Sequence, residues 1–236
     1  MAQLNMKTIG IIGGLGPQAT LDMLERIQKV CNRLIPQSAN SGYPPIYVGF
    51  CREAPMAIKP DGSVHDPLVP SDELLMVADE IGHLTDFLII ASNTPHLFQK
   101  EIEKVSDRKV LSIVEITMED VRRRGCKKVG ILAVGETLRR RLYQDPLDAE
   151  DVQWEIIPAA LSEQLDKSIF AVMEGNPTAL DPAFRAISYL REQGADGIIL
   201  GCTEIPLLLE NMCGESYIIN PSQLLAEAAV RYALEP

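Results

Sequence analysis

Short apolar runs bounded by Gly, Ser or Asn alternate with longer polar segments along the whole chain. Such runs are typical of strands that are buried on both faces of a parallel sheet. We expect strands at residues 8–12, 46–50, 87–91, 110–113, 129–133, 155–157, 197–201 and 217–219. Helix-period segments lie between them, so the chain is predicted to be an α/β protein that binds ligands at the carboxyl ends of its strands.

Two of the intervening segments show a clear helical period. A helix is predicted to follow Pro17, a residue that suits a first helical turn. Its apolar face is expected to hold Leu21, Leu24, Ile27 and Val30. The second helix should bury Leu74, Val77, Ala78 and Ile81.

The order of elements repeats within the chain. Residues 86–96 align without gaps on residues 196–206, 110 positions later, and this alignment pairs Ser92 with Cys202. Residues 7–12 align on residues 127–132 at an offset of 120. Two related α/β lobes are therefore predicted: residues 1–115 with the C-terminal segment 220–236, and residues 116–219.

Composition excludes several classes of function. The 236 residues carry a net charge of −11 and no basic run longer than three arginines, so neither a nucleic acid nor an anionic membrane is an expected partner. Five cysteines without a C-x-x-C pair argue against a disulfide scaffold or a zinc site. With no leader-like or membrane-spanning apolar stretch, we expect a cytoplasmic location.

The loop at residues 14–19 (GLGPQA) matches a dinucleotide fingerprint, G-x-G-x-x-A, directly after the first predicted strand. A dinucleotide site also needs an acidic residue after the second strand, where this chain has Arg52. NAD is therefore the minor interpretation. Backbone N–H groups near a helix start, around Gly14 and Leu15, could bind a carboxylate or phosphate, or the loop could be only a tight turn.

Cys202 follows a predicted strand and is flanked by Gly201 and Thr203. A thiol at such a strand end can act as thiolate base or thiol acid, whereas a buried structural cysteine is the alternative. The equivalent strand end carries Ser92, Asn93 and Thr94, side chains that could donate hydrogen bonds to a carboxylate or simply cap a helix. His96 follows one turn later, as a proton carrier, a supporting group or a surface residue.

These motifs resemble the aspartate/glutamate racemase superfamily, most closely its aspartate racemase branch, over nearly the whole chain. The resemblance is carried by residues 9–17 (IGIIGGLGP), 92–96 (SNTPH, where CNTAH is usual) and 200–206 (LGCTEIP). It implies two pseudo-symmetric lobes, an active site in the cleft between them, no cofactor, no metal and a homodimer. In that family two cysteines act on opposite faces of the substrate α-carbon.

Carried over by residue, the resemblance makes Cys202 a catalytic cysteine and puts Ser92 in the other cysteine's position. Asn93, Thr94 and Thr203 match groups that bind the substrate carboxylate. Because a hydroxyl is a much poorer base than a thiolate, symmetric two-base racemisation is not expected.

Two further positions bear on the substrate. Glu174 stands where the branch usually has a Lys, and a carboxylate there would repel a second substrate carboxylate. A neutral or basic amino acid is then an alternative to aspartate or glutamate. Arg52 could be the family's substrate-binding arginine, and the turn-rich segment 55–70 could be a lid or an insertion.

The predicted function is cofactor-independent amino-acid racemisation, slow or faster in one direction, with Cys202 as the main acid/base. A single-cysteine decarboxylase or isomerase of a small carboxylate, and a non-catalytic amino-acid-binding protein, are the alternatives.

Overall fold

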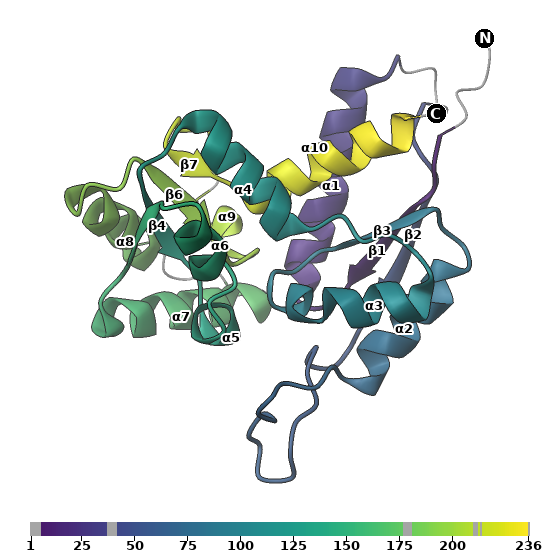
Figure 1. The fold of residues 1–236 in the computed structure, drawn as a ribbon, viewed down its shortest axis with the longest axis horizontal. Coiled ribbons are helices and arrows are strands. Elements are labelled where there is room, and N and C mark those ends of the chain that lie inside the picture. The colour runs from purple at the N-terminus through teal and green to yellow at the C-terminus, as the bar shows by residue number, and fades with distance from the viewer. Residues whose placement is uncertain (1–5, 37–41, 177–180, 210–211, 213, 236) are drawn as a thin grey trace. The chain divides into compact units, whose positions relative to one another are not determined.

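The computed structural model describes residues 6–36, 42–176, 181–209, 212 and 214–235. The chain divides into two compact units: unit 1 is Met1–Ser112 with Ser222–Pro236, and unit 2 is Ile113–Pro221. Each unit has its own sheet, in which every strand pair is parallel, with helices around it (Figure 1). The predicted α/β class with parallel sheets flanked by helices is confirmed.

In unit 1, β1 is the central strand of a sheet ordered β2-β1-β3. Its elements in chain order are β1 (Ile9–Gly13), α1 (Pro17–Leu34), β2 (Ile46–Phe50), α2 (Asp72–Gly82), β3 (Phe87–Ile90), the 3-10 helix η1 (Thr94–Phe98), α3 (Gln99–Ser106) and, at the C-terminus, α10 (Pro221–Leu234).

The helices of unit 1 cover both faces of this sheet (Figure 1). On one face, α2 and α3 bury an apolar cluster with Ile12 of β1 and Ile90 of β3. On the other, Phe87 of β3 makes an edge-to-face contact with Tyr232 of α10, with ring centroids 4.8 Å apart. Because α10 also pairs with α1 through Glu227 and Arg33 at 2.9 Å, the C-terminal helix is part of unit 1.

In unit 2, β4 is central in a sheet ordered β5-β4-β6-β7. The elements are α4 (Ile113–Arg124), β4 (Lys128–Leu132), α5 (Gly135–Arg139), α6 (Gln144–Ala149), β5 (Gln153–Ile156), α7 (Ala159–Met173), α8 (Asp181–Glu192), β6 (Gly197–Leu200), α9 (Ile205–Leu208) and β7 (Ile218–Ile219). A large apolar cluster joins α7, α8 and α9 to β4 and β6.

The two aligned segments, residues 86–96 and 196–206, begin with equivalent hydrogen bonds. In unit 1, Oδ2 of Asp86 accepts from the backbone N–H of Thr8 at 2.6 Å. In unit 2, Oδ2 of Asp196 accepts from the backbone N–H of Lys127 at 2.7 Å. Each aspartate precedes one strand and fixes the start of the central strand beside it, so both units begin their parallel pairing in the same way.

Two local predictions are wrong. Residues 110–113 do not form a strand: Val110 makes one isolated bridge to Leu88, and Ile113 already begins α4. Leu21 is not on the buried face of α1, being 64% exposed. It lies two residues before buried Met23, about 200° around the helix axis, so the packed face is centred elsewhere.

The second helical prediction is confirmed. Leu74, Val77, Ala78 and Ile81 are all buried in α2. Ser71 caps this helix by accepting a hydrogen bond from the backbone N–H of Leu74 at 3.2 Å.

Candidate active site

Cys202 lies just beyond the carboxyl end of β6. The backbone N–H of Gly201 donates to the carbonyl of Leu132 at 2.7 Å, which extends the pairing with β4 by one residue. A side chain at Gly201 would meet Ala133 at 2.9 Å, so only glycine fits this crossing. Cys202 then leaves the sheet and is partly exposed, whereas Cys31, Cys51 and Cys126 are buried. Cys213 lies outside the described residues.

The Cys202 thiol has a carboxylate partner. Its Sγ donates to Oε2 of Glu204 at 3.1 Å, and Oγ1 of Thr203 donates to the same oxygen at 3.1 Å. Thr203 and Glu204 are both buried. Burial and the negative charge of Glu204 raise the pKa of the Cys202 thiol well above its usual value. The resting group is therefore a neutral thiol beside a proton acceptor.

Sequence reasoning missed Glu204. The residue was visible as the fourth member of the GCTE motif, two positions after Cys202. Its role depends on the tight turn after β6, which brings a side chain two positions along the chain back to the sulfur. A sequence spacing of two residues does not by itself predict such a contact.

The end of β3 repeats the geometry of the end of β6. The backbone N–H of Ala91 donates to the carbonyl of Ile12 at 2.9 Å, as Gly201 does to Leu132. Ser92 follows and is partly exposed, Asn93 is buried, and Thr94 begins η1. The structure thus puts these three predicted residues together at the carboxyl end of the unit 1 sheet.

His96 supports this turn from inside. The ring is buried, and its Nδ1 lies 3.0 Å from the carbonyl oxygen of Ser92 and 3.2 Å from that of Asn93. Burial lowers the pKa of His96 to about 4, although hydrogen bonds to the carbonyls of Asn93, Ser92 and Leu111 act in the opposite direction. His96 is therefore neutral near pH 7, and its contacts fix the loop that carries Ser92.

The glycine loop after β1 is held by α1. The backbone N–H of Gly14 donates to Oγ1 of Thr20 at 2.9 Å, and this hydroxyl donates to the carbonyl of Gly16 at 3.0 Å. Gly14 has φ 80° and passes so close to the carbonyl of Cys51 that a Cβ would lie 2.0 Å away. The Gly14 amide is already used within the loop, and Leu15 packs against the apolar cluster of unit 1.

Arg52 directly follows β2 and its neighbouring Cys51, and the side chain is exposed. The backbone N–H groups of Arg52 and Glu53 donate to Oε2 of Glu73 at 2.9 and 2.7 Å. These bonds fix the backbone but do not direct the guanidinium.

Residues 55–70 form a long loop with antiparallel bridges that extends away from the rest of unit 1 (Figure 1). Bridges join Met56 to Pro70 and Ile58 to Val64, and the turn is at Asp61 and Gly62. The chain between residues 55 and 70 thus has hydrogen-bonded structure of its own.

Glu174 lies at the C-terminal end of α7. Its backbone N–H donates to the carbonyls of Phe170 and Val172, and its side chain is exposed. The helix end therefore positions its backbone, while the carboxylate faces solvent.

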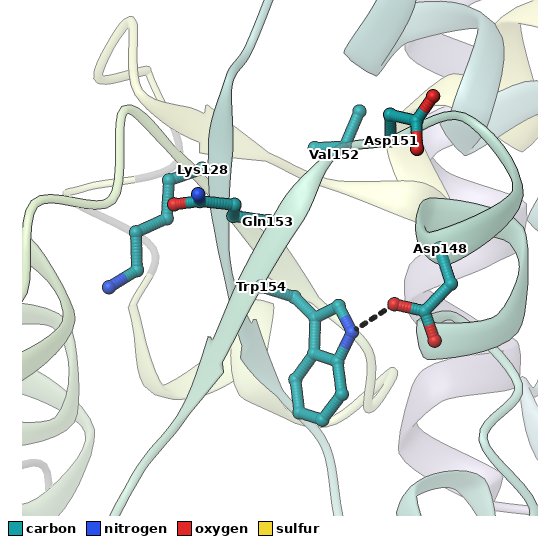
Figure 2. A pocket seen from close by; sticks show the side chains of 6 residues that line it. All are labelled: Lys128, Asp148, Asp151, Val152, Gln153 and Trp154. Carbon is teal, nitrogen blue, oxygen red and sulfur yellow. Dashed lines mark hydrogen bonds between the residues drawn. The ribbon is translucent and has the colours of Figure 1, made fainter.

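A surface hollow of about 440 Å³ lies elsewhere in unit 2 (Figure 2). Lys128 and Gln153 in its wall are the first residues of β4 and β5, so the hollow is at the amino ends of these strands. The indole of Trp154 donates to Asp148 at 2.8 Å across it. Since α/β proteins bind ligands at the carboxyl ends of strands, and no predicted site residue lines this hollow, we assign it no role.

The described residues contain neither a metal-binding cluster nor a membrane-spanning helix. No group of three or more His, Cys, Asp or Glu side chains in this part of the chain is placed to hold a metal ion. No helix of the described segments has the length and apolarity needed to cross a membrane.

The chain matches known proteins over nearly its whole length. A family model described as Asp/Glu/Hydantoin racemase matches residues 12–229. The broad specificity amino-acid racemase RacX of Bacillus subtilis is 26% identical over 224 residues, which cover 94% of this chain and 96% of that protein.

Solved structures show the same fold. An aspartate racemase of Picrophilus torridus superposes with a TM-score of 0.77 at 22% identity, covering 96% of this chain and 94% of that one. An aspartate racemase homologue of Pyrococcus horikoshii gives 0.76 at 22% identity, covering 98% and 100%. Because the family model spans far more than half of the sequence, the chain belongs to the Asp/Glu/hydantoin racemase family.

Proposed function

We propose that the protein is a cofactor-independent amino-acid racemase in which Cys202 removes and returns the proton on the substrate α-carbon. The observation that carries this proposal is the 3.1 Å contact between Sγ of Cys202 and Oε2 of Glu204 at the carboxyl end of β6. This contact lets Cys202 take both protonation states that the reaction needs. Proton transfer to Glu204 gives a thiolate base, and the neutral thiol is an acid.

The chemistry balances without an added reagent. The Cys202 thiolate takes the α-proton, which leaves a carbanion beside the substrate carboxylate and regenerates the thiol. Return of a proton to the same face gives exchange, and return to the opposite face gives the other enantiomer. We assign the opposite-face role to Ser92, whose hydroxyl gives its proton to the carbanion; the alkoxide then takes a proton from solvent, and Glu204 releases its proton to solvent. A hydroxyl is a weaker acid and base than a thiol, so this step is slow.

The remaining candidates bind the substrate in this proposal. Asn93, Thr94 and Thr203 donate hydrogen bonds to the α-carboxylate, with Arg52 and the loop at Gly14 and Leu15 as further contacts. Donors to the carboxylate also stabilise the charge that develops when the α-proton leaves. Thr203 already donates its hydroxyl to Glu204, so its contribution comes from the backbone N–H.

The test is incorporation of solvent deuterium at the α-carbon. L- and D-amino acids are incubated with the protein in D₂O and followed by proton NMR. Wild-type protein should exchange the α-hydrogen of at least one amino acid, and Cys202→Ala should not. Cys126→Ala, which removes a buried thiol of the same unit, is the matched control and should retain exchange. Exchange that survives in Cys202→Ala would refute the assignment.

One observation favours a second reaction class. Because burial and Glu204 raise the pKa of the Cys202 thiol, the resting thiol is protonated and is a single proton donor. A decarboxylase or an isomerase of a small carboxylate needs only one such donor. Product formation from a carboxylic acid without exchange of the substrate α-hydrogen would identify that reaction. A homodimer stays a prediction from the family resemblance, and a cytoplasmic location stays a prediction from the sequence composition.

A further inference from the structure

The strand β2 is an open edge of the unit 1 sheet. Among the described residues it pairs with β1 and with no other strand. The opposite outer strand, β3, is covered, because the backbone N–H of Leu88 donates to the carbonyl of Lys109 and the N–H of Leu111 donates to the carbonyl of Leu88, both at 2.9 Å. An open edge carries backbone donors and acceptors that can bind another strand.

The side chains of β2 make this edge apolar. Tyr47, Val48 and Phe50 are 45%, 39% and 49% exposed, and the strand (IYVGF) carries no charge. Edge strands of soluble proteins are normally protected by charged residues, by proline or by short length. The outer strands of unit 2 follow this rule, since β5 carries Glu155 and β7 has only two residues. In the described part of the chain, β2 is therefore the outer strand that is both uncovered and uncharged.

The backbone of β2 presents alternate residues to the open side. The N–H of Cys51 donates to the carbonyl of Gly13 at 2.9 Å, so the odd-numbered residues of this segment bond to β1. The even-numbered residues Ile46, Val48 and Phe50 therefore direct their N–H and C=O groups away from β1. Each of them can exchange both hydrogen bonds with a residue directly opposite in an antiparallel partner strand.

The edge is complementary to itself in one antiparallel register. With Val48 on a two-fold axis, Val48 faces Val48 of a second copy, and Ile46 faces Phe50 of that copy. All the outward backbone groups of the strand then oppose outward groups. In the same register Tyr47 lies opposite Gly49 of the second copy. An aromatic side chain beside a glycine, and an aromatic side chain beside a β-branched one, are favourable cross-strand pairs.

The sequence around β2 limits the contact to this strand. Pro44, the next outward residue before Ile46, has no N–H to donate, so pairing does not extend in that direction. Each chain carries a net charge of −11, and an uncharged strand lets two copies approach with the least repulsion.

The exposed apolar area suits the centre of a dimer interface. With roughly 200 Å² for an aromatic side chain, the exposed parts of Tyr47 and Phe50 amount to about 200 Å² per copy. A standard interface buries about 800 Å² per partner, in which an apolar centre is surrounded by a polar rim. These two side chains with Val48 therefore supply an apolar centre, and flanking polar residues supply the rim.

We propose that two copies of this protein associate through β2, which pairs with β2 of the second copy in the antiparallel register centred on Val48. This pairing joins the two three-stranded unit 1 sheets into one continuous sheet. Two-fold association uses the same edge on both copies, so no strand is left open. The family resemblance predicts a homodimer without naming a surface, and the inference adds the strand and its register. It does not depend on the chemistry at Cys202.

The first measurement is the mass in solution, by sedimentation equilibrium at micromolar protein concentrations. Wild-type protein should have twice the 26.0 kDa mass of one chain. Val48→Lys puts two like charges opposite each other on the axis and should raise the dissociation constant of the dimer by at least about 100-fold. Ile156→Lys is the matched control, because Ile156 is 37% exposed on the outer strand β5 of unit 2, and it should leave the dimer unchanged.

Cysteine cross-linking tests the register. Val48→Cys brings two thiols to directly opposite positions, where the Cα atoms of a hydrogen-bonded antiparallel pair lie about 5.5 Å apart, within the range of a disulfide. Mild oxidation should therefore link two Val48→Cys chains through this residue, as identified by mass spectrometry. Ile46→Cys has the same native cysteines, but its two thiols would be separated by roughly 13 Å along the strand, so it should not cross-link.

A wild-type monomer, or a dimer whose dissociation constant is the same in Val48→Lys, overturns the inference. Cross-linking of Ile46→Cys but not of Val48→Cys overturns it as well, because it requires a different pairing. If circular dichroism shows that Val48→Lys does not fold, the two cysteine variants decide the question. A wild-type dimer that exchanges no α-hydrogen refutes the proposed function and leaves the inference in place.

Discussion

Sγ of Cys202 lies 3.1 Å from Oε2 of Glu204, and this carboxylate acts on the thiol in two opposite ways. Its charge raises the pKa of the thiol, which disfavours the thiolate. Its oxygen is also the nearest acceptor for the thiol proton. Substitution of Glu204 should therefore change reactivity and catalysis in different directions.

For Glu204→Gln, we expect the pH midpoint of Cys202 alkylation by iodoacetamide to move to lower pH, because a charge that opposes the thiolate is gone. Exchange of the substrate α-hydrogen should nevertheless fall by about 100-fold, since the proton acceptor is lost. Alkylation is followed at Cys202 by mass spectrometry, with exposed Glu215→Gln as the control. A midpoint that moves to higher pH would contradict this account of the site.

Ser92→Cys should convert a slow, one-sided site into a more symmetric one. A thiol is a far better proton donor and acceptor than a hydroxyl, so we expect the racemisation rate to rise by about tenfold or more. Ser92→Ala should abolish interconversion but retain exchange of one enantiomer. Rates for both enantiomers are measured by chiral chromatography and NMR. If Ser92→Ala racemises as fast as wild type, Ser92 has no acid/base role.

His96 should make the stability of the protein depend on pH. Its pKa is lowered to about 4 in the folded protein, compared with about 6.5 in an unfolded chain. A neutral buried imidazole stabilises the fold fully above pH 6.5, and this contribution is lost as the pH falls toward 4. The difference of about 2.5 pKa units corresponds to roughly 3 kcal/mol.

The measurement is urea unfolding between pH 7.5 and 4, with His96→Gln as the comparison. Carboxylates titrate in both proteins, so the difference between the two curves isolates the histidine. The free energy of unfolding should fall more steeply below pH 6.5 in wild type than in His96→Gln. Parallel curves would show that His96 is not buried as a neutral ring.

Gly14 and Gly62 give a matched pair for testing the glycine loop. Both have positive φ, 80° and 82°, but a Cβ at Gly14 would lie 2.0 Å from the Cys51 carbonyl, whereas Gly62 has open space. Gly62→Ala should cost about 1–2 kcal/mol from backbone strain alone. Gly14→Ala adds a clash with backbone and should cost at least about 2 kcal/mol more. Thermal unfolding measures both, and equal losses would refute the close approach.

The sequence predicted the architecture well where the signal was long or repeated. Asp86 and Asp196, which are aligned in the sequence repeat, accept equivalent hydrogen bonds from the backbone at the start of the central strands. The apolar run at residues 46–50 matches β2 in its bounds, but the predicted burial is wrong, because β2 is an edge strand on which Tyr47, Val48 and Phe50 are exposed. Prediction was wrong where one apolar residue satisfied two patterns, as Ile113 did at the start of α4, and where Leu21 continued an apolar spacing on the wrong side of α1.

The same contrast holds for the candidate site: the sequence identified residues, and the structure showed their contacts. Motifs identified Cys202 and the segment from Ser92 to Thr94, because these residues follow strands and strand ends are visible in a sequence. His96 was visible too, but its role was not: only burial against the carbonyls of Ser92 and Asn93 makes it a neutral support. Glu204 acquires its contact with Cys202 from the turn after β6.

The sequence by itself therefore determined the α/β class, the repeated order of strands and helices, and the strand-end residues, since these depend on periodicity and local spacing. The tertiary structure decided which carboxylate lies beside the thiol and how far each titrating group is buried. Burial and through-space charge arise from residues far apart in the chain. A pKa is set by distance and desolvation, which a one-dimensional pattern does not contain.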